Sequence, residues 1–182
     1  DLLAYARRQG PGFGLGQQNG TEAGMAKAGV RGQWRLNENL SLQGEAYRME
    51  NISSETLRHA AQLELAYRGA DWSARGGLQW ARDEAPGGKV AESRQVTLGA
   101  DRQFFDRKLN LSVQADIGLD GGNDSVDFPN RLQLGAAYRV NDALQVVAAQ
   151  EFTDGEAHDT ATTRIGFETT PWANAQLTST LN

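Results

Sequence analysis

The feature that most constrains this chain is a strict alternation of apolar and polar residues. Between positions 109 and 119 every odd position is apolar, and the interleaved positions are polar or small. Successive side chains of a β-strand point to opposite faces, so this pattern predicts a strand with one apolar and one polar face. The alternation recurs, for example over 61–67 and 132–140, and no stretch shows a helical period. The sequence therefore predicts an all-β fold.

The alternating segments predict eleven strands in one up-and-down antiparallel meander that forms a single domain over 1–182. The expected strands are 1–9, 22–36, 39–49, 57–68, 71–82, 93–105, 108–119, 131–140, 143–152, 161–170 and 174–182. Most exceed the about 5–6 residues of a typical globular strand and suit the about 9–11 residues that cross a membrane. Short polar turns are expected at 37–39, 69–71, 106–107, 141–142 and 171–173. Longer linkers are expected at 10–20, 50–56, 83–92, 120–130 and 153–159.

Composition excludes several other classes of protein. The 182 residues contain no Cys, which excludes a disulfide scaffold, a Cys-ligated zinc site and a thiol nucleophile. A net charge of −5 argues against nucleic acid as a partner. No apolar run reaches the about 18 residues of a membrane helix, and we see no targeting segment at the N-terminus. The mean hydropathy of −0.57 suggests a soluble protein, but an average hides an apolar face made of alternate residues.

The polar positions of the expected strands carry many charges in mid-strand. Charged residues predicted to line the interior of a barrel are Lys27, Arg31, Arg35, Glu45, Glu64, Arg68, Arg75, Asp101, Asp116, Arg131, Arg139, Arg164 and Glu168. With Lys108 and Glu151 added, basic residues outnumber acidic ones on this face. A basic lumen would favour anions if water filled it. The alternative is that these charges pair across strands and plug the interior, as side chains do in barrels of about eight strands.

Aromatic residues gather at the ends of the apolar stripe. The predicted aromatic belts consist of Trp34, Tyr67, Trp72, Trp80, Phe104, Tyr138, Phe152, Phe167 and Trp172, while Tyr47 falls on the opposite phase. Amphipathic rings favour the two interfaces of a membrane, so belts about one strand length apart indicate a membrane-spanning sheet. Short turns at one end of the strands and long loops at the other favour the same interpretation.

Hairpins such as 134–146 resemble those of bacterial outer-membrane β-barrels, in particular the barrel portions of large proteobacterial surface proteins. The resemblance implies a pore, translocation conduit or membrane anchor in the outer membrane of a Gram-negative bacterium. It implies contact with the lipid bilayer and lipopolysaccharide, ions or small solutes in the lumen, and further domains of a larger parent protein. Single-chain bacterial barrels have even strand numbers, so eleven strands predict a segment of a larger barrel. A ten-strand barrel, in which both terminal stretches share one position, is the other possibility.

Alternative functions have weaker support in the sequence. A soluble antiparallel barrel or sandwich that binds an apolar ligand would show the same alternation. An outer-membrane enzyme could use His59, near Ser53 and Ser54, or His158, but neither matches a known motif, and exposed loop-end histidines explain both. The acidic loop 120–127 could hold Ca²⁺, although EF-hand spacing is absent. We therefore expect no enzyme activity, no catalytic residue, no metal and no cofactor.

Overall fold

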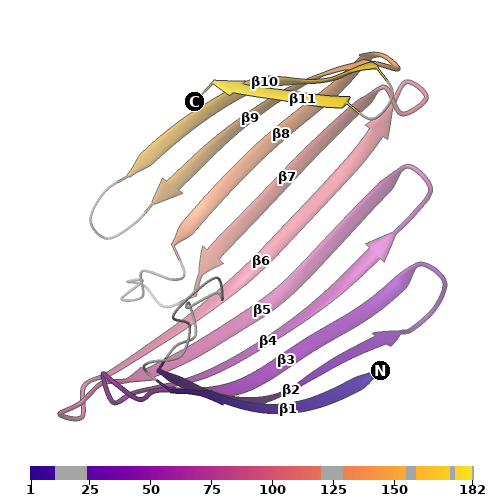
Figure 1. Cartoon of the computed structure of the whole chain (residues 1–182). Helices are drawn as coiled ribbons and strands as arrows, with labels where there is room; N and C mark the ends of the chain where they lie inside the picture. Colours follow the sequence, from indigo (N-terminus) through magenta and orange to yellow (C-terminus); the bar gives the residue numbers. More distant parts are fainter. Residues whose placement is uncertain (11–23, 120–128, 155–158, 173–174, 182) are drawn as a thin grey trace.

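The computed structural model describes residues 1–10, 24–119, 129–154, 159–172 and 175–181, and within them the chain forms a single antiparallel sheet (Figure 1). Eleven strands follow one another in chain order from β1 to β11. They are β1 (Leu2–Gln9), β2 (Met25–Arg35), β3 (Leu40–Asn51), β4 (Thr56–Arg68), β5 (Trp72–Glu84), β6 (Val90–Phe104), β7 (Leu109–Gly118), β8 (Asn130–Asn141), β9 (Leu144–Asp154), β10 (Thr160–Trp172) and β11 (Ala175–Leu181). The predicted all-β meander is confirmed.

The strand boundaries lie close to those that the alternation predicts. The largest difference within the described residues is at β6, which was expected from position 93 and begins at Val90. Because β3, β4, β5 and β6 extend further than predicted, the linkers expected at 50–56 and 83–92 shorten to 52–55 and 85–89. The contrast between short turns and long loops is therefore smaller at these two connections than the sequence predicts.

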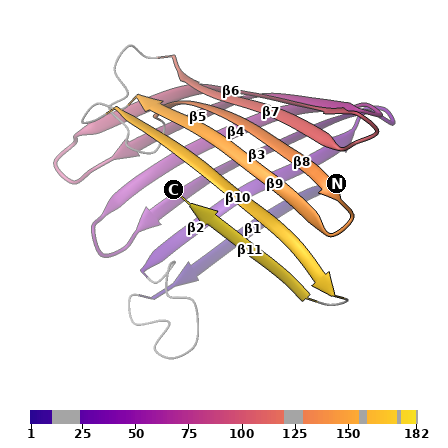
Figure 2. The ribbon, with the colours of Figure 1, turned by 90° about the horizontal axis from the view of Figure 1, so that it is seen from above.

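The sheet is curved but not closed into a barrel (Figure 2). Figure 1 shows β1 at one edge and β11 at the other, and no pairing joins them. The two terminal stretches thus occupy separate strand positions and do not share one. Since every neighbouring pair is antiparallel, β1 and β11 run in the same direction, and their direct closure would create a parallel seam. An antiparallel closure requires an odd number of additional strands.

Within the described residues, the sheet has no core of large apolar side chains. Apart from glycines, the buried residues of the described part of the chain are Ala81, Ser93, Gln95 and Asp116, and none of them is a large apolar residue. Large apolar side chains are exposed instead, with Leu78 and Ile165 each 56 % exposed. None of the described segments is a helix long and apolar enough to cross a membrane.

Two kinds of turn close the hairpins opposite the long connections. Asn37 leads from β2 to β3, and its Oδ1 accepts hydrogen bonds from the backbone N–H groups of Asn39 (2.9 Å) and Leu40 (2.8 Å). This is an Asx-turn, which Asn favours. In the connection of β6 to β7, Phe105, Asp106 and Arg107 have φ angles of 54°, 52° and 67°. Three successive residues without glycine in the left-handed region are uncommon.

Candidate functional site

The cross-strand register assigns each side chain to one of two faces, because directly paired residues lie on the same face. Arg31 pairs with Glu45, Glu45 with Gln62, and Gln62 with Gln79. Continued across the sheet, the register brings all the charged residues predicted to line the interior onto this face, which we call the polar face. They are Lys27, Arg31, Arg35, Glu45, Glu64, Arg68, Arg75, Asp101, Asp116, Arg131, Arg139, Arg164 and Glu168.

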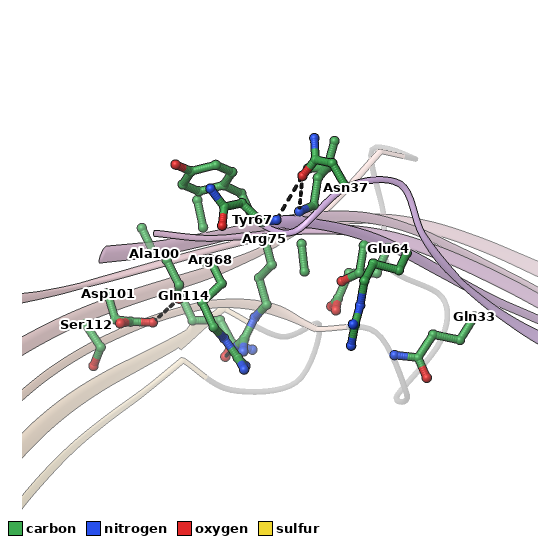
Figure 3. A pocket seen from close by; sticks show the side chains of 18 of the residues that line it. Gln33, Asn37, Glu64, Tyr67, Arg68, Arg75, Ala100, Asp101, Ser112 and Gln114 are labelled. Atoms are coloured by element: carbon green, nitrogen blue, oxygen red, sulfur yellow. Dashed lines mark hydrogen bonds between the residues drawn. The ribbon is translucent and has the colours of Figure 1, made fainter. Parts of the chain in front are cut away.

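The polar face is the concave side of the sheet. By register Ala81, Ser93, Gln95 and Asp116 all lie on it, so the buried residues of the described part gather there, glycines aside. Side chains from β2 through β8 line one hollow of about 850 Å³ on this face. A hollow shared by strands so far apart requires the face to be concave. Figure 3 shows Arg68, Arg75 and Gln114 on the hollow side of the ribbon.

Most charges of the polar face have a partner. Arg131 Nη2 lies 2.7 Å from Asp116 Oδ2, and Arg164 Nη1 lies 3.9 Å from Glu151 Oε2. Glu45 accepts hydrogen bonds from Tyr5 and, at 3.4 Å, from Arg31. The Nζ of Lys27 lies 3.9 Å from Glu45.

Carboxylates and guanidinium groups also bond to neutral side chains. Glu64 accepts from Gln43 Nε2 at 2.8 Å, Asp101 accepts from the Ser73 hydroxyl, and Arg75 donates to Gln114 Oε1 at 2.6 Å. The pairing that the sequence analysis offered as an alternative to an anion-attracting interior is thus present over much of the polar face.

Two arginines of the hollow stand outside this pairing. Within the described residues, the side chains of Arg35 and Arg68 have no hydrogen-bond or ion-pair partner. Both lie toward the end of the strands where β2 and β4 reach their short turns. The two arginines place positive charge near that end, where Asp1 and Glu38 also line the hollow.

The polar face also carries glutamines. The predicted interior residues were all charged and did not include them. Each strand from β2 to β8 places at least one glutamine there: Gln33, Gln43, Gln62, Gln79, Gln95, Gln114 and Gln133. Their positions in the alternation indicate the shared face, but only the register shows how close together they lie.

The opposite face, which we call the outer face, carries the aromatic residues that were predicted to form belts. Trp34, Tyr67, Trp72, Phe104, Tyr138 and Phe167 lie on it toward the short turns, and Trp80 and Phe152 lie toward the other end. The rings of Tyr67 and Trp72 are 4.5 Å apart. Trp172 belongs to β10, but its side chain lies outside the described residues. Tyr47 lies on the polar face, as its phase predicts.

The candidate catalytic and metal-binding residues do not form a site in the described chain. His59 lies on the outer face, where it pairs in register with Arg48 and Arg82. His158 and the acidic loop 120–127 lie outside the described residues. Within the described ranges, no three His, Asp or Glu side chains lie close enough together to hold a metal ion.

No protein-family model, no curated protein and no solved structure matches the chain. The function is therefore inferred from the two faces of the sheet.

Proposed function

We propose that this chain forms the wall, or part of the wall, of a membrane-spanning β-barrel in the outer membrane of a Gram-negative bacterium. The outer face contacts lipid, and the polar face lines a water-filled interior. The barrel serves as a pore or conduit for solutes, and it anchors any further domains of the parent protein.

The contrast in burial between the two faces carries this proposal. Leu63, Leu98 and Val113 on the outer face are 47 %, 47 % and 41 % exposed, whereas the polar face contains Gln95 and Asp116 at 4 % and 6 %. Water disfavours the exposure of so many large apolar side chains on one face, and soluble monomers rarely show it. Lipid removes the cost, because the outer face then meets hydrocarbon.

The same contrast disfavours a soluble barrel that binds an apolar ligand. Such a barrel would direct its apolar residues inward. Here the hollow of about 850 Å³ is lined by groups such as Glu64, Arg75, Asp101 and Gln114, which suit water and polar solutes.

The spacing of two tryptophans supports the membrane assignment. Trp72 and Trp80 lie on the outer face of β5, eight residues apart. This separation corresponds to about 26 Å along the strand, or about 20 Å along the membrane normal at the usual tilt. Both rings then lie near the edges of an apolar band about 25 Å tall.

A matched pair of cysteine variants tests the proposal, since the natural chain contains no Cys. Thr97→Cys and Leu98→Cys introduce thiols at adjacent positions of β6 that lie on opposite faces. After refolding into phosphatidylcholine vesicles, we expect a fluorescent label at 98 to be quenched by doxyl lipids. A label at 97 should be quenched by aqueous iodide. If iodide quenched the label at both positions and doxyl lipids quenched neither, the proposal would be refuted.

Single-channel recording in planar bilayers distinguishes a pore from a membrane anchor. Ion conductance through the refolded chain supports the pore. An inserted barrel without conductance would exclude the pore and leave the anchor.

A further inference from the structure

The glutamines of the polar face form three short rows in direct cross-strand register. Gln33 pairs with Gln43 on β2 and β3. Gln62, Gln79 and Gln95 pair in succession on β4, β5 and β6, and Gln114 pairs with Gln133 on β7 and β8. Along the strands the three rows are offset by at most four residues, which is about 13 Å. Together they form a band of amides across seven neighbouring strands, which we call the amide track.

The hollows of the polar face adjoin one another along the amide track. A hollow of about 310 Å³ is lined by Gln33, Gln62 and Gln79, and one of about 500 Å³ by Gln79, Gln95 and Gln114. Gln33 and Gln114 also line the hollow of about 850 Å³. Because the hollows share lining residues, a solute in one of them can extend into the next.

The charges beside the amide track are largely compensated. Arg131 is paired with Asp116 at 2.7 Å, and Arg31 with Glu45 at 3.4 Å. The carboxylate of Glu64 already accepts a hydrogen bond from Gln43. An ion that approached the middle of the track would meet charge pairs rather than a field of one sign.

Several amides of the track remain available to a ligand. The side chains of Gln33, Gln62, Gln79 and Gln133 have no hydrogen-bond partner within the described residues. Each amide offers two donor hydrogens and one acceptor oxygen without a net charge.

From this arrangement we propose that the amide track binds a neutral, polyhydroxylated solute, namely an oligosaccharide of uncharged sugar units. The inference deepens the proposed function and rests on its assignment of the polar face to a water-filled interior. Sugar hydroxyls both donate and accept hydrogen bonds, and so do amides, so the two groups can pair in more than one orientation. The glutamines project from the face of the sheet and not from a free edge, so the track offers a peptide no backbone partner for strand addition.

Isothermal titration of the full chain, refolded in detergent, with maltohexaose tests the inference. We expect weak, saturable binding that polyethylene glycol of similar size does not reproduce. Gln62→Met/Gln79→Met removes two free amides at nearly constant volume and should weaken binding roughly ten-fold, by analogy with two lost neutral hydrogen bonds. The matched control is Gln150→Met, which removes a glutamine of the outer face and should leave binding unchanged.

Other outcomes overturn the inference. Absence of maltohexaose binding by the folded wild-type chain, or equal weakening by Gln150→Met, would exclude the amide track as the site. Tighter binding of a neutral Gly-Ser peptide would identify a different ligand. If the methionine variant does not fold, Gln62→Ser/Gln79→Ser replaces it with polar side chains too short to reach the same ligand atoms.

Vesicle insertion is measured separately, so a chain that inserts without binding sugar refutes this inference alone. A chain that binds sugar without inserting refutes only the membrane assignment.

Discussion

Arg131 of β8 holds the buried carboxylate of Asp116 on β7 from directly across the strand pair. Its Nε and Nη2 lie 2.9 Å and 2.7 Å from the same oxygen, Oδ2. Asp116 is 6 % exposed, so water cannot replace the guanidinium without structural change. A buried carboxylate that loses its cationic partner keeps its desolvation cost.

Arg131→Gln should therefore destabilise the sheet by about 2 kcal/mol, less than a fully buried pair because the arginine is partly exposed. Urea unfolding of the refolded protein, followed by tryptophan fluorescence, measures the free energy of unfolding. Arg139→Gln is the control on the same strand, because its side chain has no partner within the described residues; its effect should stay within about 0.5 kcal/mol. An equal loss of unfolding free energy in the two variants would contradict the role assigned to the pair of Arg131 and Asp116.

Gly29 provides the space in which Tyr5 and Tyr47 pack on the polar face. A Cβ at this position would lie 2.7 Å from the carbonyl oxygen of Ala46 and 2.9 Å from the hydroxyl of Tyr5. Gly29→Ala should destabilise the protein by about 1–3 kcal/mol, as overpacking does. Gly76→Ala is the control, since its nearest neighbour would be Leu98 Cδ2 at 3.7 Å. Thermal melts of both variants in the same detergent provide the comparison, and a stable Gly29→Ala protein would contradict the packing.

The assignment of residues to faces could be predicted from the sequence because it depends only on the period of two. Arg75 and Leu78 are separated by an odd number of positions, so they occupy opposite faces wherever β5 begins. The phase of Tyr47 was predictable for the same reason. Alternation alone does not determine which face points outward, because the pattern is identical in a soluble barrel and a membrane barrel.

The partners of individual side chains could not be predicted in this way. That Gln62 lies beside Gln79, or that Arg131 faces Asp116, depends on the register of neighbouring strands. Register depends on the geometry and length of the connections as well as on the alternation, and the β3–β4 and β5–β6 connections proved shorter than predicted. The open edges at β1 and β11 likewise follow from curvature and pairing, to which local alternation is insensitive.

The connection between β6 and β7 places Arg107 in the left-handed region, with φ of 67°. This conformation costs a residue with a Cβ about 1–2 kcal/mol, and glycine adopts it freely. Arg107→Gly should therefore stabilise the protein by about 1 kcal/mol after the greater entropy of the unfolded chain is deducted. At Glu38, where φ is not positive, glycine should instead lower stability, and the midpoints of urea unfolding distinguish the two outcomes. Destabilisation by both substitutions would show that the turn tolerates Arg107 without strain.

The unpaired arginines of the hollow should determine which ions a pore prefers. Arg35 and Arg68 contribute two positive charges near the short-turn end, where Asp1 and Glu38 also line the hollow. The reversal potential in a KCl gradient measures the ion preference, and the two arginines should move it toward chloride. Arg35→Gln/Arg68→Gln should shift it toward potassium. The shift should be larger in 0.1 M than in 1 M salt, because the screening length falls from about 10 Å to about 3 Å. Arg102→Gln removes a charge from the outer face, where its guanidinium carbon lies 5.0 Å from the Phe104 ring centroid, and should leave the reversal potential unchanged. An equal shift for both variants would contradict the assignment of the polar face to the conducting side.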